Sequence, residues 1–454
     1  MRRFSKLMAL VALPVMLSFF VACGGNGGAD TTPTETEATQ EAPTQEEAPV
    51  DEATTAETTT EQDRPFAGQT ITLGLWGGNE SEEAAMDLAL AEFYELTGIT
   101  VERRLYHEYQ TQLQTELIGG IAPDVFYMEA FLFPSMVVTG VLEPLNQFMG
   151  AGFDEADFFG PTLDAFRHDG QIFGLPKDMS TLGLIYNIDL LEAAGFTSDD
   201  IPNNIVDFAA FIQEVDNNTP DSVTAFVSSS ELARHLFLLE ANGTSIADED
   251  GRAVLTQPNQ HPTLQLLMDG FHSGAAARAA DLGYGWSGDA MGLGNVVFIM
   301  EGNWAIGHLN MNFPELNYGT RSVPLIEGAN RSMLFTVAYS MNAASTNKEA
   351  TWEFINFITG TDGMHTWTYN ATVLPTRATV AASTGFADHP LLAPFVAAGA
   401  YATPWQKGET LPIIMREYNN FIPAVISGDM TLIEAMTAAE EAANLDIEAL
   451  MLQP

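Results

Sequence analysis

The sequence is short of cysteine and of basic residues. Cys23 is the one cysteine among 454 residues, so no disulfide can form within the chain, and a zinc or iron–sulfur site built from several thiolates is excluded. Lysine and arginine total 17 against 60 aspartate and glutamate residues, which gives a net charge of −43. Because so acidic a surface repels phosphate groups, the composition argues against nucleic acid as a partner and against electrostatic docking on anionic lipid.

Signatures of catalysis are also scarce. The chain has no G-x-x-x-x-G-K-[ST], H-E-x-x-H or G-x-S-x-G motif, and none of its 8 histidines pairs with another at i, i+4. Residues 283–288 match G-x-G-x-x-G, but they follow an alanine-rich stretch instead of a clear strand, so we do not expect a nucleotide loop there. We therefore expect no cofactor, no metal and no catalytic residues. The many carboxylates leave a glycosidase-type acid and base pair open.

The N-terminus has the pattern of an export signal. Residues 1–22 combine a basic start with an apolar run over 7–21, which is shorter than the roughly 20 residues that a membrane span needs. The run ends at Ala22-Cys23, which resembles the lipobox of bacterial lipoproteins, although Phe20 stands where leucine is usual. We therefore expect cleavage before Cys23, lipidation of its thiol, and a protein anchored at the outer face of the cytoplasmic membrane, extracellular or periplasmic.

A low-complexity segment follows the lipidation site. Residues 24–65 are rich in Thr, Glu, Ala, Pro and Gln, with no aromatic residue. Such a composition buries too little apolar surface to offset the entropy lost on ordering. The segment 23–65 is thus predicted to be a lipidated cysteine followed by a disordered acidic tether.

The remaining chain alternates strand and helix patterns. Period-two alternation predicts a strand over 70–76, Asn79 with Glu82 has the spacing of a helix capping box, and a helix is expected from there to Gly98. A strand over 99–103 completes a β-α-β unit. Further strands are expected over 122–128, 182–187, 296–300 and 334–341, and helices over 109–118, 189–194, 348–359 and 432–443. This order predicts an α/β fold.

Several segments together resemble the solute-binding proteins of ABC importers, in the sugar-binding group that includes maltose-binding protein. The similar motifs occur in the family's order across residues 70–450, behind the lipobox and tether. They are Ala122-Pro123-Asp124-Val125, Gly174-Leu175-Pro176 with Leu184 to Leu191, Met300 to Ile306, Met341 to Ile355, and Leu374-Pro375-Thr376-Arg377. The family's P-x-T-[WY]-x-E motif is degraded here over 201–208.

The resemblance implies a two-lobed periplasmic-binding-protein-like fold (type II) with a hinged cleft between the lobes. Lobe one would comprise residues 66–178 plus 337–371, and lobe two 179–336 plus 372–454. Three chain crossings would connect them, at 178–181, 332–336 and 371–374. A cleft between lobes is a common ligand site, and hinge closure brings both lobes onto the ligand.

Sugar sites need flat apolar faces for the ring and polar groups for the hydroxyls, so aromatic, carboxylate and amide residues near the cleft are candidates. Trp76 ends a strand, where α/β crevices bind ligands, and Trp304 matches a family tryptophan that stacks on sugar. The competing roles are helix capping for Asn79 and Glu80, turn support for Asp124, and core packing for the tryptophans. The candidates are Trp76, Asn79, Glu80, Asp124, Glu129, Asp178, Ser180, Trp286, Asp289, Trp304, Trp367 and Tyr369.

The family resemblance thus predicts a monomeric, non-enzymatic receptor that captures a sugar or oligosaccharide and delivers it to the transmembrane subunits of an ABC permease. Two alternatives remain open from the sequence. The same scaffold could bind a non-sugar solute, such as a polyamine, a peptide or a phosphorylated small molecule, or the chain could be a secreted glycoside hydrolase.

Overall fold

The computed structural model describes residues 64–452. The predicted signal peptide, Cys23 and all but the last two residues of the tether lie outside this range. The described residues belong to one compact unit of the chain.

One long mixed sheet organises the unit. Its strands run in the order β2-β1-β3-β11-β6-β9-β7-β8, with β10 pairing with β6 and β12 pairing with β11. The strands are β1 (Thr70–Trp76), β2 (Thr100–Tyr106), β3 (Val125–Glu129), β6 (Gly174–Asn187), β7 (Thr224–Val227), β8 (Ala276–Ala277), β9 (Val296–Gly302), β10 (Tyr318–Arg321), β11 (Met333–Met341) and β12 (Thr403–Pro404). A separate hairpin joins β4 (Arg167–His168) to β5 (Gln171–Ile172). The predicted α/β class is confirmed.

The first β-α-β unit forms where the sequence predicted it. Helix α1 (Glu80–Thr97) begins with a capping box between Asn79 and Glu82 and ends at Gly98, whose positive φ of 71° suits glycine. β1 then pairs in parallel with β2 and with β3. This arrangement places the end of β1 and the start of α1 at one edge of the sheet, where the site lies.

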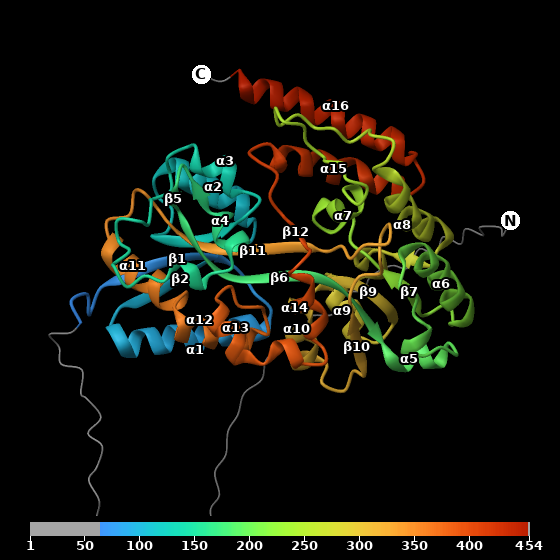
Figure 1. Cartoon of the computed structure of the whole chain (residues 1–454), viewed down its shortest axis with the longest axis horizontal. Coiled ribbons are helices and arrows are strands. Elements are labelled where there is room, and N and C mark those ends of the chain that lie inside the picture. The colour runs from blue at the N-terminus through green and yellow to red at the C-terminus, as the bar shows by residue number, and fades with distance from the viewer. Residues whose placement is uncertain (1–63, 453–454) are drawn as a thin grey trace, which may run out of the picture. The chain divides into compact units, whose positions relative to one another are not determined.

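Two long strands connect the two ends of the sheet. The sequence predicted a strand over 182–187 only, but β6 is one continuous strand of 14 residues, all of them buried. Its antiparallel partner β11 also pairs with β3, so β6 and β11 run through the middle of the molecule (Figure 1). Burial on every side explains why β6 lacks the alternation that would have revealed its length.

The three segments that the resemblance marked as crossings lie next to one another. Phe335 pairs with Ser180 in the β6–β11 ladder, and Met179 exchanges backbone hydrogen bonds of 2.8 and 3.2 Å with Leu374. These three neighbouring segments, here called the waist, lie where β6 and β11 pair along the middle of the sheet.

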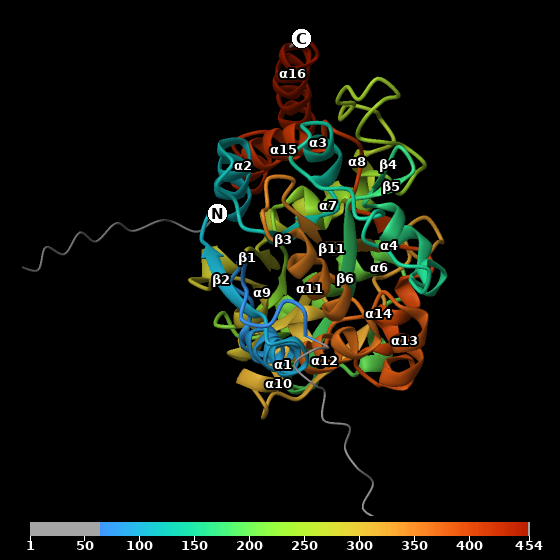
Figure 2. The same ribbon diagram turned by 90° about the vertical axis from the view of Figure 1, so that its left-hand side faces the viewer.

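Helices cover the sheet in separate groups. α1 packs against α11 and α12 at the β1 end, whereas α6 and α8 pack together at the β7 end (Figure 1). α15 and α16 form a pair over α7 and α8, and α10 lies beside α1 (Figure 2). The remaining helices are α2 (Tyr109–Gly119), α3 (Phe133–Val137), α4 (Gly160–Asp164), α5 (Ile188–Ala193), α6 (Ile205–Asn218), α7 (Leu232–Leu239), α8 (His261–Ser273), α9 (Ser287–Gly292), α10 (Trp304–Asn312), α11 (Lys348–Ile358), α12 (Thr361–Ala371), α13 (Ala378–Thr384), α14 (Ala393–Ala398), α15 (Leu411–Ile426) and α16 (Leu432–Met451).

Within residues 64–452, no helix is both long enough and apolar enough to cross a bilayer. The same residues contain no group of three or more His, Cys, Asp or Glu side chains arranged to hold a metal ion.

Candidate functional site

A cavity of about 820 Å³ opens where the ends of β1, β3 and β9 meet the β6–β11 pair. Its walls come from both ends of the sheet, with α1 and α12 contributing from one side and α7, α9 and α10 from the other. Ten of the twelve predicted residues line it. They are Trp76, Asn79, Glu80, Glu129, Asp178, Ser180, Trp286, Asp289, Trp304 and Trp367.

Trp76 is a fixed aromatic wall at the end of β1. Its ring meets Tyr109 edge-on at a centroid distance of 5.0 Å and Tyr127 at 4.8 Å. The hydroxyl of Tyr109 is itself anchored on the carbonyl of Tyr127. Because these two tyrosines are buried, the indole of Trp76 is supported on one side and faces the cavity on the other.

Two further tryptophans lie against glycines. A Cβ at Gly302 would overlap the indole of Trp304, and a Cβ at Gly288 would overlap the indole of Trp286. Trp304 begins α10 directly after β9, and Trp286 is the residue before α9. The glycines make room for the two rings at the cavity wall, so these tryptophans have preset positions.

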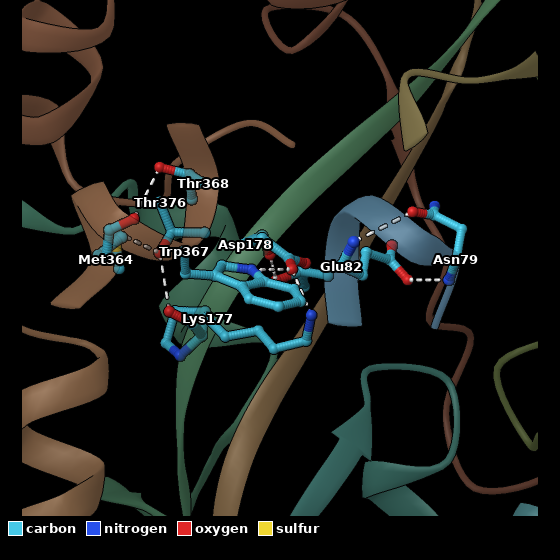
Figure 3. Close-up of polar contacts among 10 residues, drawn as sticks. Asn79, Glu82, Lys177, Asp178, Met364, Trp367, Thr368 and Thr376 are labelled. Carbon is cyan, nitrogen blue, oxygen red and sulfur yellow. Dashed lines mark hydrogen bonds and ion pairs between the residues drawn. The ribbon is translucent and has the colours of Figure 1, made fainter. Parts of the chain in front are cut away.

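A buried ion pair lies on β6 at the waist. Asp178 accepts hydrogen bonds at Oδ2 from Lys177 Nζ and, at 2.8 Å, from Trp367 Nε1 (Figure 3). Lys177 Nζ also lies 4.2 Å from the centroid of the Trp367 ring and 4.8 Å from that of Tyr127. The lysine charge is thus enclosed by one carboxylate and two aromatic faces.

Glu82 faces this pair from α1. Its Oε2 accepts a hydrogen bond of 3.2 Å from the backbone N–H of Asn79, which completes the capping box (Figure 3). Burial raises the pKa of Glu82, the Asp178 charge raises it further, and Lys177 opposes the rise. One residue therefore caps a helix and presents a carboxyl group to the cavity.

A second ion pair lies on the other wall, between α7 and β9. Both Nε and Nη2 of Arg234 lie 3.0 Å from Glu301 Oε1, and the other oxygen of Glu301 accepts a hydrogen bond of 2.7 Å from Ser287. The guanidinium carbon is 5.0 Å from the centroid of Trp304 and 5.4 Å from that of Phe335. This cation, too, is enclosed by a carboxylate and two aromatic rings.

Glu129 ends β3 at the cavity wall. Its Oε2 accepts a hydrogen bond of 2.9 Å from Gln110. Burial raises the pKa of the Glu129 carboxyl to about 7, against the lowering effects of the Gln110 hydrogen bond and the Arg234 charge, and nearby Glu231 adds to the rise. This carboxyl group therefore titrates near neutral pH.

A polar rim joins α1 to α10. Asn312 donates a hydrogen bond of 2.8 Å to Glu80 Oε2, which lowers the pKa of Glu80. His308 lies between two carboxylates, with Nε2 3.2 Å from Asp289 and Nδ1 3.7 Å from Glu80. The edge of the Trp286 ring packs on the same imidazole at 4.8 Å.

Two predicted ligand residues lie away from the cavity lining. Asp124 accepts hydrogen bonds of 2.8 Å from the backbone and side chain of Thr72 and one of 2.6 Å from Ser345, so its carboxylate holds together the turn before β3. Tyr369 is exposed on α12 and stacks between His365 and Phe386. The structure therefore places neither Asp124 nor Tyr369 with the other ten residues at the cavity.

Sequence reasoning missed several cavity residues. Lys177 adjoins Asp178 and is one of four lysines in the chain, a signal that could have drawn attention to it. Glu82 was assigned to capping alone. Arg234, Glu231 and Trp405 carry no motif, because they reach the cavity from segments far from β1 and β3 along the chain.

A family comparison agrees with this geometry. The model of the bacterial extracellular solute-binding protein family matches residues 89–394, which is more than half of the chain. The chain belongs to this family.

Relatives and solved structures add to that assignment. This solute-binding protein is 27% identical over 273 residues to a lactose-binding protein of Rhizobium radiobacter and 25% identical over 273 residues to an arabinooligosaccharide-binding protein of Bacillus subtilis. The matched regions cover 56% and 57% of this chain, and the chain spans about three fifths of the length of these curated relatives, 61% and 60%. An ABC substrate-binding protein of Listeria monocytogenes, solved in complex with cycloalternan, superposes with a TM-score of 0.75 at 21% identity, over 84% of this chain and 99% of its own. This likeness shows the two-lobed solute-binding fold.

Proposed function

We propose that this solute-binding protein captures a sugar or oligosaccharide in the cavity and serves as the substrate-binding component of an ABC importer. The observation that carries the proposal is the combination of preset tryptophans with polar groups around one space of about 820 Å³. Trp76, Trp286 and Trp304 supply flat faces for sugar rings, and the carboxylates accept hydrogen bonds from hydroxyl groups. The lactose- and arabinooligosaccharide-binding relatives support the same ligand class.

The proposal includes a hinge. The two lobes are residues 66–178 plus 337–371 and 179–336 plus 372–454, and they close on the ligand by bending at the waist where 178–181, 332–336 and 371–374 lie together. A cavity that takes residues from both lobes would then form completely when the lobes close. The closed form is the one that the permease transmembrane subunits recognise.

Outside the described residues, the proposal places the protein on the cell exterior. The pattern at 1–22 supports export, and the Ala22-Cys23 junction supports lipidation of Cys23 and anchoring through the tether. The chain is proposed to act as a monomer that binds its sugar and releases it unchanged, without cofactor or metal.

Thermal unfolding of the purified protein against a library of mono- and oligosaccharides, polyamines and amino acids tests the proposal. A sugar present at 100 times its Kd adds about 2.7 kcal/mol to the free energy of unfolding, which raises Tm by several degrees. We expect a shift with one sugar class and no product on chromatography. A shift with polyamines alone would replace the sugar by a cationic solute, and product formation would make the chain a hydrolase.

A further inference from the structure

The cavity contains two cationic side chains of Lys or Arg type among its described lining residues, and both already have a counter-ion. Lys177 pairs with Asp178, and the two side chains are 6% and 10% exposed. Arg234 pairs with Glu301, at 17% and 4% exposed. Because each cation has a buried carboxylate as its partner, both positive charges are largely offset within the protein before a ligand binds.

The aromatic rings reinforce this neutralisation. The rings of Trp367 and Tyr127 lie near Lys177 Nζ, and those of Trp304 and Phe335 lie near the guanidinium of Arg234. The Nε and Nη2 groups of Arg234, which present its fork for a carboxylate or phosphate, both point at Glu301. A ligand anion would have to displace a buried carboxylate to reach Lys177, and near Arg234 it would meet a guanidinium whose charge Glu301 already offsets.

The other charged groups of the cavity are mostly acidic. The cavity is lined by the carboxyl groups of Glu80, Glu82, Glu83, Glu129, Glu231 and Asp289. The groups that contact the Glu82 and Glu129 carboxylates are a backbone N–H and the amide of Gln110. The raised pKa of Glu129, near 7, reflects burial and the neighbouring Glu231 charge. The surroundings of Glu129 thus already disfavour the negative charge of its own carboxylate, and an anionic ligand would add a second negative charge nearby.

We infer that the cavity selects sugars that are uncharged or carry an amino group, and discriminates against the same sugars bearing a carboxylate or a phosphate. The inference rests on the proposed sugar-binding function and names its ligand class. Charges several ångströms apart at a partly buried site change affinity roughly 30- to 100-fold. A uronic acid or sugar phosphate should therefore bind weaker than its neutral parent by about that factor.

Calorimetric titration of matched ligand sets at pH 8 tests the inference. Each set holds a neutral sugar, its uronic acid, its 6-phosphate and its 2-amino-2-deoxy analogue, built on glucose, galactose and mannose and on their β-1,4-linked disaccharides. We expect the neutral and amino members of one set to bind and the two anionic members to bind roughly 30- to 100-fold weaker. Anionic members that bind as tightly as the neutral parent would overturn the inference while leaving the sugar-binding function standing. If no member of any set binds and no sugar of the wider thermal-unfolding library binds either, both the inference and the proposed function are overturned.

Two variants locate the effect in the cavity. Glu301→Gln removes the counter-ion of Arg234, so the uronic acid should gain affinity relative to the neutral sugar by roughly fivefold or more. The matched control is Glu116→Gln, which removes an equal charge from an ion pair with Arg104 away from the cavity lining, and should leave the ratio unchanged. If Glu301→Gln does not fold, Glu129→Gln tests the same point without breaking an ion pair. An unchanged ratio in the folded cavity variants would contradict the inference.

Discussion

The two walls of the cavity hold the same kind of cluster, assembled in different ways. On one wall, neighbouring residues of β6 form the pair of Lys177 and Asp178, with Trp367 packed on it. On the other, Arg234 and Glu301 come from α7 and β9, 67 positions apart, with Trp304 packed on the cation. The first pair is set by one strand and the second by tertiary packing, so the same cation–carboxylate–tryptophan arrangement arises from local and from long-range order.

The clusters also differ in burial. Asp178 anchors a lysine that is almost enclosed, whereas Arg234 keeps more contact with solvent at the cavity wall. Removing one partner of a buried pair leaves an uncompensated charge, and the cost of that charge falls as solvent reaches it. Substitutions on the two walls should therefore have unequal effects.

The largest effect is expected for Asp178→Ala. This change strands the buried ammonium of Lys177 and leaves Trp367 Nε1 without its acceptor, so the free energy of unfolding should fall by about 3–5 kcal/mol. Urea unfolding measures it. Glu448→Ala, at an exposed pair with Arg252, is the control and should cost about 1 kcal/mol or less. If both variants lower the free energy of unfolding by the same amount, the prediction that Lys177 and Asp178 form a buried pair is wrong.

Glu301→Ala should cost less, about 2–3 kcal/mol, because Arg234 can turn toward solvent once its partner is gone. The same urea unfolding series compares the two walls directly. If Glu301→Ala lowers the free energy of unfolding more than Asp178→Ala does, the predicted order is wrong. Long-range packing, and not burial, would then determine how much each substitution destabilises the protein.

The contrast between local and long-range contacts also explains which parts of the fold and the site could be predicted from the sequence. The β-α-β unit and the capping box at Asn79 were predictable because periodicity and caps are local signals, whereas the full length of β6 and helices such as α6, α8 and α15 were not predicted. Asp178 and Trp304 were found through motif resemblance, but the role of Arg234 was not, since its partner Glu301 lies on another element. For Asp124 the sequence left ligand contact and turn support open, because a carboxylate beside a strand has the same sequence pattern in both roles, and the structure shows the turn contacts. Tertiary pairing decides such cases, and a single sequence does not display it.

A third test concerns how Trp304 is placed. Trp304→Ala should weaken sugar binding by about 2 kcal/mol, roughly 30-fold in Kd, since a buried aromatic platform carries a large share of binding energy. Gly302→Ala keeps the indole of Trp304 but displaces it, because the new Cβ would overlap the ring, and should weaken sugar binding by about 1–2 kcal/mol. Titration of both variants with the sugar identified by thermal unfolding measures the effects. Unchanged affinity in Gly302→Ala would show that the preset ring position does not matter.

The pH dependence of stability tests the partly buried carboxyl group of Glu129 at the cavity wall. The pKa of Glu129 is about 7 in the folded protein against an ordinary value of 4.5, so the folded state holds a proton that the unfolded state has lost between these values. Stability should therefore fall as pH rises from 4.5 to 7, by about 1–2 kcal/mol from this partly buried group. In Glu129→Gln this part of the slope should disappear, as Tm measured across the same pH range would show. A slope identical to that of the parent protein would remove Glu129 as its source.

The smallest effect belongs to the rim, where Glu80 of α1 and Asn312 of α10 connect the two walls. Glu80 is exposed, so a double-mutant cycle of Glu80→Ala and Asn312→Ala should give a coupling energy of about 0.2–1 kcal/mol. The pKa of Glu80 is lowered, chiefly by the Asn312 hydrogen bond, so the coupling is present above the ordinary pKa of 4.5 and is lost as pH falls through the folded value. Repeating the cycle with sugar bound tests whether the hydrogen bond between Glu80 and Asn312 contributes to closure of the lobes. A coupling energy that increases when sugar binds would assign this hydrogen bond to the closed state. An unchanged coupling energy would leave the two ion-pair clusters and Trp304 as the contacts that hold the walls around the sugar.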